Sequence, residues 1–80
     1  MTVSVKLFAT LRKYLPENAV NKTATLELSD QATANEIITQ LAIPDGHIHL
    51  ILINGKHSAE DTPLSEGAVV SFFPPIAGGE

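Results

Sequence analysis

The sequence predicts an α+β domain in which a mixed sheet of four to five strands carries one main helix on one face. Three observations predict it: several short segments have the apolar pattern of strands, one segment has apolar residues at helical spacing, and turn-forming residues separate them. The chain has 80 residues and is 44% hydrophobic, which suits a single core and is too apolar for a disordered chain. We expect one domain over residues 1–75 and a flexible Gly-Gly tail over residues 76–80.

The first half of the chain predicts two antiparallel strands. Apolar and polar residues alternate over residues 3–7 and again over 23–28, the period of a half-buried strand. Residues 11–15 between them predict a short helical turn that Pro16 ends, and residues 17–22 predict a polar loop. This connection is longer than a tight hairpin needs.

The main helix is predicted after residue 33. Thr33 is followed three residues later by Glu36, the spacing of a capping box, in which the two side chains accept hydrogen bonds from exposed N–H groups. The apolar face that follows consists of Ile37, Ile38, Leu41 and Ala42. We expect a helix of about ten residues, which Pro44 and Gly46 end.

The second half predicts three further strands. Residues 49–53 form a continuous apolar run closed by Asn54-Gly55, a tight-turn signal because both residues tolerate positive φ. Residues 56–58 are expected to return as a short edge strand. Residues 62–67 predict a turn with room for one helical turn, and residues 68–73 predict the last strand.

The faces and the end of the last strand follow from its pattern. Alternation places Val70 and Phe72 on one face, and the opposite face receives Val69, Ser71 and Phe73. Pro74 and Pro75 lack the N–H groups that a sheet ladder needs, so they end the pairing.

Composition excludes several classes of function. The net charge is −4, from nine acidic and five basic residues, whereas nucleic-acid binding needs clustered Lys and Arg, so we expect no nucleic-acid partner. The chain has no cysteine, which excludes disulfides and thiolate metal sites. The start of the chain lacks the pattern of a signal peptide, and no apolar stretch approaches the length of a membrane span. We expect a cytoplasmic protein without a membrane partner.

Titratable residues offer weak signals for a metal or an acid–base pair. His47, His49 and His57 could supply ligands, but no cysteine or local acidic cluster completes a set. Asp45 lies near them in sequence, without a nucleophile or a predicted pocket. We therefore expect no metal site, no bound cofactor and no active site of the chain's own. Four basic residues are most simply solvated charges: Lys6, Arg12, Lys13 and Lys56.

The C-terminal glycines carry the strongest functional signal. Glycines at the end of a domain pack nothing and lose the most entropy when they are ordered. Gly78 and Gly79 therefore indicate a working tail that can enter a narrow slot and present a backbone carboxyl group.

Four segments resemble the MoaD/ThiS family of sulfur carriers. Residues 5–12 (VKLFATLR) resemble its first strand, residues 53–55 (ING) its mid-chain turn, and residues 63–67 (PLSEG) its stretch before the last strand. Residues 72–79 (FFPPIAGG) are similar to the C-terminal signature of the small subunit of molybdopterin synthase, and the Phe-Phe-Pro-Pro element separates this subgroup from the thiamine-pathway carriers. The resemblance implies the ubiquitin-like β-grasp fold.

The resemblance also implies a protein that is a substrate of other enzymes. An E1-like adenylating enzyme would use ATP to join AMP to the Gly79 carboxylate, and sulfur would displace AMP to leave a thiocarboxylate. The tail, which Gly78 allows to thread, would enter the large catalytic subunit of molybdopterin synthase and donate sulfur in molybdenum cofactor biosynthesis. The family docks through the sheet face opposite the helix and through the tail, which implies these docking residues: Phe8, Phe73, Pro74, Pro75 and Ile76. The alternative for Phe8 is a position beneath residues 11–15.

Glu80 departs from the family pattern, because the working tail of the family stops at the second glycine. Three explanations compete. A processing peptidase removes Glu80, or the chain is a relative that no longer carries sulfur. The third is that Glu80 is an artefact or is tolerated by an unusual partner. The alternative functions are a carrier for thiamine or tungsten-pterin synthesis, a ubiquitin-like modifier, and a non-covalent interaction module.

Overall fold

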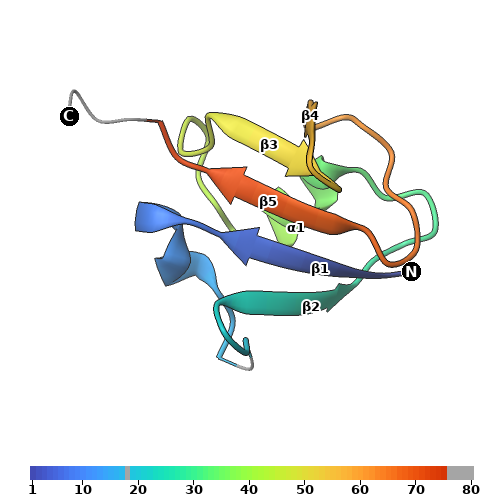
Figure 1. Ribbon diagram of the computed structural model, residues 1–80, viewed down its shortest axis with the longest axis horizontal. Helices are drawn as coiled ribbons and strands as arrows, with labels where there is room; N and C mark the ends of the chain where they lie inside the picture. Colours follow the sequence, from blue (N-terminus) through green and yellow to red (C-terminus); the bar gives the residue numbers. More distant parts are fainter. Residues whose placement is uncertain (18, 76–80) are drawn as a thin grey trace.

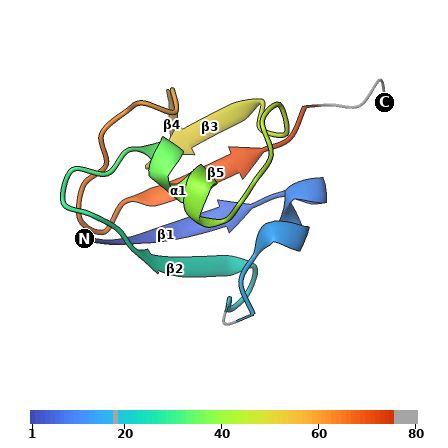
Figure 2. The ribbon, with the colours of Figure 1, turned by 180° about the vertical axis from the view of Figure 1, so that it is seen from behind.

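The computed structural model of the protein describes residues 1–17 and 19–75. Within these residues, five strands form one mixed sheet in the order β2-β1-β5-β3-β4, and the helix α1 lies across one face (Figures 1 and 2). The elements in chain order are β1 (Thr2–Leu7), the 3₁₀ helix η1 (Ala9–Tyr14), β2 (Thr23–Glu27), α1 (Ala34–Gln40), β3 (Leu50–Ile53), β4 (Lys56–Ser58) and β5 (Val69–Phe73). The predicted α+β domain, a mixed sheet with one main helix on one face, is confirmed.

Strands β1 and β5 run parallel at the centre of the sheet, whereas the other neighbouring pairs are antiparallel. A parallel pair needs a long crossover, and here the chain between β1 and β5 contains β2, α1, β3 and β4. Because the two strands point the same way (Figure 1), both end at the same end of the sheet. The chain therefore leaves β5 beside the end of β1.

The core lies between the sheet and α1. Alternation along β1 buries Val3, Val5 and Leu7, and alternation along β5 buries Val70 and Phe72, as predicted. Ala34 and Ile37 are the fully buried residues of α1. In the described part of the chain, no polar or charged residue is buried, so the core is held by apolar packing and by the backbone ladder.

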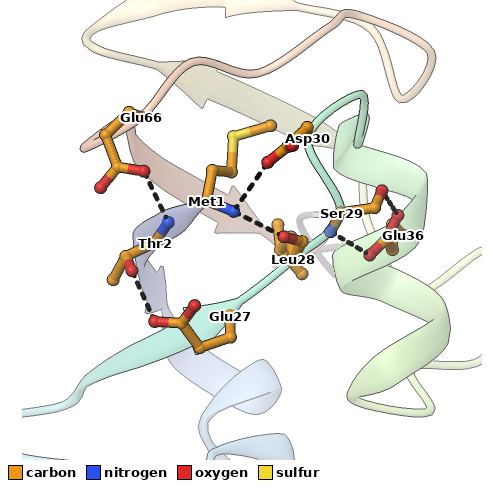
Figure 3. Close-up of polar contacts among 8 residues, drawn as sticks. All are labelled: Met1, Thr2, Glu27, Leu28, Ser29, Asp30, Glu36 and Glu66. Carbon is orange, nitrogen blue, oxygen red and sulfur yellow. Dashed lines mark hydrogen bonds and ion pairs between the residues drawn. The ribbon is translucent and has the colours of Figure 1, made fainter.

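The start of α1 corrects the predicted capping box. Thr33 is the N-cap residue, but its side chain makes no capping hydrogen bond. The Glu36 carboxylate accepts hydrogen bonds from the Ser29 N–H at 3.1 Å and the Ser29 hydroxyl at 2.9 Å (Figure 3). The Glu60 carbonyl instead accepts the N–H of Asn35 at 2.8 Å. Partners from other segments thus replace the local reciprocal cap.

The end of α1 corrects the predicted helix length. The helix has seven residues and ends in a Schellman motif, in which Ala42 N–H bonds Thr39 O and Ile43 N–H bonds Ile38 O, both at 3.1 Å. Ala42 has a left-handed backbone conformation with a φ of 59°. Its side chain is exposed and is not part of the predicted apolar face. No helix in residues 1–17 and 19–75 is long and apolar enough to cross a membrane.

Smaller differences occur at the ends of the other elements. The predicted helical turn over residues 11–15 is the 3₁₀ helix Ala9–Tyr14. The strands predicted over residues 49–53 and 68–73 each begin one residue later, and residues 62–67 contain no helical turn. These are shifts of element ends rather than changes of element type.

The Asn54-Gly55 turn is confirmed and is also fixed to β5. Both residues have positive φ, 53° and 84°. The Asn54 N–H donates to the Val69 carbonyl at 2.8 Å, and the Asn54 side-chain oxygen accepts the Val69 N–H at 2.9 Å. The asparagine therefore serves both the turn geometry and the start of the last strand.

Polar contacts fasten the beginning of β1 (Figure 3). The Thr2 N–H donates to Glu66 Oε1 at 3.0 Å, and the Thr2 hydroxyl donates to Glu27 Oε2. The ammonium group of Met1 donates to the Leu28 carbonyl at 2.7 Å and lies 3.6 Å from Asp30 Oδ1. These contacts lie at the end of the sheet opposite Phe73, away from the exit of the chain (Figure 1).

Candidate functional site

Phe8 and Phe73 form a stacked aromatic pair, with ring centroids 4.4 Å apart and an interplanar angle of 10°. Leu7 and Phe72 are register partners of the parallel pair, and both are buried. The next residue of each chain segment must point to the opposite side of the sheet, which places both phenylalanines on the face away from α1, as predicted. The Phe8 ring lies against Phe73 instead of taking the alternative position beneath residues 11–15.

Leu50 and Leu52 extend this apolar surface. Leu50 pairs with Phe73 and Leu52 with Ser71 across the antiparallel β3–β5 ladder. Ile51 and Ile53 are buried on the helix side, so Leu50 and Leu52 point away from α1, where both are half-buried. We call Phe8, Leu50, Leu52 and Phe73 the open-face patch.

Leu50 and Leu52 were not predicted as site residues, because residues 49–53 were interpreted as a strand whose side chains were not assigned to faces. The signal was present, because a strand that is apolar on both faces is expected to be covered on both faces. Because α1 covers one face of β3, the apolar side chains on its other face indicate a surface that a partner covers.

The root of the tail lies beside the open-face patch. The last β5 contact is the hydrogen bond from His49 N–H to Phe73 O at 2.8 Å, and Pro74 is half-buried and Pro75 exposed after it. Neither proline has an N–H to extend the ladder. The other predicted site residues, Ile76, Gly78 and Gly79, lie outside the described residues, as does Glu80.

The histidines are not brought together. His47 Nδ1 lies 3.3 Å from the Asp45 carbonyl and its ring meets Tyr14 edge-on, whereas His49 precedes β3 and His57 lies on β4. Across residues 1–17 and 19–75, no group of three or more histidine, cysteine or acidic side chains is arranged to hold a metal ion. The four basic residues expected to be solvated are all exposed: Lys6, Arg12, Lys13 and Lys56.

A five-stranded mixed sheet with central parallel strands, one helix across one face and an apolar patch at the end of the final strand defines a ubiquitin-like β-grasp protein. The ThiS family model matches residues 5–79. The chain therefore belongs to the ThiS family, and the resemblance to the MoaD/ThiS carriers is confirmed. A search of curated protein sequences gave no match.

Solved structures of three proteins are similar over nearly the whole chain. A putative molybdopterin converting factor subunit 1 from Pyrococcus furiosus is 26% identical, with a TM-score of 0.70 over 94% of this chain and 98% of that one. SAMP1 from Haloferax volcanii is 24% identical, with a TM-score of 0.75 over 99% and 100%. A chain from the complex of subunits 1 and 2 of the Helicobacter pylori molybdopterin-converting factor is 22% identical, with a TM-score of 0.59 over 99% and 100%. The last two likenesses bear on the fold alone.

Proposed function

We propose that the protein is a sulfur carrier of the type found as the small subunit of molybdopterin synthase. Membership of the ThiS family supports this function, as do the FFPP element before Gly78-Gly79 and the similarity to the Pyrococcus furiosus converting factor subunit. The observation that carries the proposal is the parallel pairing of β1 and β5, because it puts the open-face patch beside the root of the tail. One partner surface can then cover the patch and receive the tail.

The chemistry takes place on the Gly79 carboxyl group. In an adenylating partner, this carboxylate attacks the α-phosphate of ATP and pyrophosphate leaves, so that AMP becomes a good leaving group on the acyl carbon. A sulfur nucleophile then displaces AMP: hydrosulfide gives the thiocarboxylate directly, whereas a protein persulfide gives an acyl disulfide that a thiol must reduce. The two glycines have no side chains to obstruct a narrow channel.

Two protein partners follow from this chemistry: an E1-like activating enzyme, and the large catalytic subunit of molybdopterin synthase, which transfers the sulfur to a pterin precursor. The Helicobacter pylori molybdopterin-converting factor, one chain of which has the same fold, is a complex of its subunits 1 and 2 and supports the second partner. We propose that the reaction takes place in the cytoplasm, where ATP is available to the activating enzyme. The prolines at the root of the tail restrict the chain before binding, which reduces the entropy lost when the tail inserts.

Glu80 must be removed before activation. While it is present, the carboxyl group of Gly79 is part of a peptide bond and cannot be adenylated. We propose that a peptidase cleaves after Gly79, and that its product is the competent carrier.

Reconstitution with an activating enzyme tests this function. Chains ending at Gly79 and at Glu80 are incubated with the activating enzyme, ATP and sulfide, and their intact masses are measured. The shorter chain is expected to gain the mass difference of sulfur for oxygen, and the longer chain is expected to remain unchanged. If the shorter chain gains no sulfur, or is recovered in isopeptide linkage to lysines of other proteins, the carrier function is wrong.

A further inference from the structure

A basic hollow lies at the carboxyl end of β1. Its volume is about 240 Å³, and its walls include Lys6 of β1, Arg12 of η1, Lys22 of the turn before β2, and Phe8. Asn21 and Thr23 complete the polar part of the wall. We call Lys6, Arg12 and Lys22 the basic corner.

The basic corner is positively charged, whereas the whole molecule has a net negative charge. The chain has a net charge of −4, yet three of its five basic residues line this one hollow. No aspartate or glutamate is among the lining residues. Within residues 1–17 and 19–75, the ion pair found is between the Met1 ammonium and Asp30, so no described carboxylate neutralises the corner. Like charges gathered in this way repel one another and attract anions.

The turn that carries Lys22 has an unfavourable backbone conformation for lysine. Val20 and Thr23 exchange backbone hydrogen bonds of 2.9 and 3.0 Å, and the two residues between them have positive φ, 53° for Asn21 and 65° for Lys22. Two-residue turns with positive φ at both positions favour Asn-Gly, because glycine has no steric cost there. A lysine in the position suited to glycine keeps a cation at the hollow against the local backbone preference.

The basic corner is continuous with the open-face patch. Phe8 belongs to both, since its ring stacks on Phe73 and the residue also lines the hollow. A protein that covers the patch therefore reaches the hollow, where an acidic side chain gains from three cations and its apolar neighbours gain from Phe8. A free anion such as phosphate would gain nothing from the aromatic ring.

We propose that the basic corner binds carboxylates of an acidic segment on the protein that receives the tail. The proposal rests on the proposed function for the existence of that partner, taken here as the large subunit of the synthase. Exposed charges at the edge of an interface act mainly on the association rate and its salt dependence. The basic corner thus steers and orients the partner, while the open-face patch provides the apolar contact.

Binding of the large subunit to charge variants tests the proposal. Dissociation constants are measured at low and high salt with chains that end at Gly79: the unmodified protein, the triple variant Lys6→Gln, Arg12→Gln and Lys22→Gln, and the single variants Lys13→Gln and Lys56→Gln. The triple variant is expected to bind about tenfold more weakly at low salt, as the loss of three exposed ion pairs implies, and to show a smaller salt dependence. The single variants change basic residues outside the hollow and are expected to bind as the unmodified protein does.

The variant Lys22→Gly separates binding from folding. Glycine relieves the left-handed backbone and removes one cation, so its denaturation midpoint is expected to rise while its affinity for the large subunit falls. If the triple variant binds as tightly as the unmodified protein with the same salt dependence, the basic corner has no role in docking. Saturable binding of inorganic phosphate to the isolated protein, lost in the triple variant, would overturn the proposal in favour of a free-anion site. If the unmodified protein does not bind the large subunit at all, the proposed function itself is wrong.

Discussion

At the scale of single residues, Ala42 shows how a tertiary constraint overrides a sequence signal. Pro44 and Gly46 indicated the end of the helix, but the chain turns earlier because the Schellman motif buries Ile43 under the end of α1. The residue at the left-handed position is an alanine, for which this conformation costs about 1 kcal/mol or more. A glycine there would have revealed the boundary in the sequence.

Replacing Ala42 with glycine is therefore expected to stabilise the protein. The relief of the left-handed strain outweighs the greater backbone entropy of glycine in the unfolded chain, with a net gain of up to about 1 kcal/mol. Denaturant unfolding measures this gain as a higher midpoint with an unchanged slope. Ala59→Gly is the matched control, since Ala59 is exposed and lacks a positive φ, and it is expected to leave stability unchanged or lower it. A loss of stability in Ala42→Gly would contradict this account.

The replaced capping box gives a second residue-scale prediction. The side-chain bond joins Ser29 to Glu36, whereas the Thr33 side chain makes no cap. A double-mutant cycle between Ser29→Ala and Glu36→Ala is expected to give a coupling of about 0.5–1 kcal/mol. The cycle between Thr33→Ala and Glu36→Ala is expected to give a coupling near zero. If the coupling between Thr33 and Glu36 is as large as the roughly 0.5–1 kcal/mol expected for Ser29 and Glu36, the capping box forms in solution.

At the scale of elements, the strands could be predicted well because their pattern is local. Alternation assigns the faces of β1 and β5 and predicts Phe8 and Phe73 on the same face, whereas their stacking follows from the register of the parallel pair. The faces of β3 were not assigned, because residues 49–53 are apolar on both sides. The basic corner could not be predicted either: it joins residues from β1, η1 and the turn before β2, and their meeting depends on the path of that connection.

The open-face patch is expected to bind a partner at the tail end of β5. Phe73→Ala removes an aromatic contact at the centre of the patch and is expected to weaken binding of the large subunit by tenfold or more, the effect of roughly 1.4 kcal/mol at an interface hot spot. Val69→Ala is the control, because Val69 is 37% exposed on the same face but lies about 13 Å away along the strand. Titration calorimetry measures both affinities. An equal loss in the two variants would place the contact elsewhere on the sheet.

At the scale of the whole molecule, the fold serves to present one end of the sheet. The parallel central strands bring the aromatic pair, the basic hollow and the root of the tail to that end. The contacts of Thr2 with Glu27 and Glu66 lie at the opposite end. In the proposed function, a partner that docks at the end with Phe8 and Phe73 would therefore leave the polar contacts that fasten β1 undisturbed.

Much of this architecture could be predicted from the sequence, because the fold depends on local periodicity and on turn residues such as Asn54-Gly55. The functional assignment rests on a different kind of signal, the residues that follow β5. Glycines without side chains leave no packing pattern, so their role is implied by family membership and by the surface beside the root of the tail. Chemistry on the tail is therefore the decisive test.

The intact mass of the protein isolated from its host cells tests the central claim most directly. We expect a chain that ends at Gly79, with a fraction in which one oxygen is replaced by sulfur. Brief treatment with a thiol-selective alkylating reagent should shift that fraction alone, because the chain has no cysteine and its Met1 thioether reacts far more slowly than a thiocarboxylate. A protein that always retains Glu80, carries no added sulfur and forms no adenylate with its activating enzyme would contradict the account.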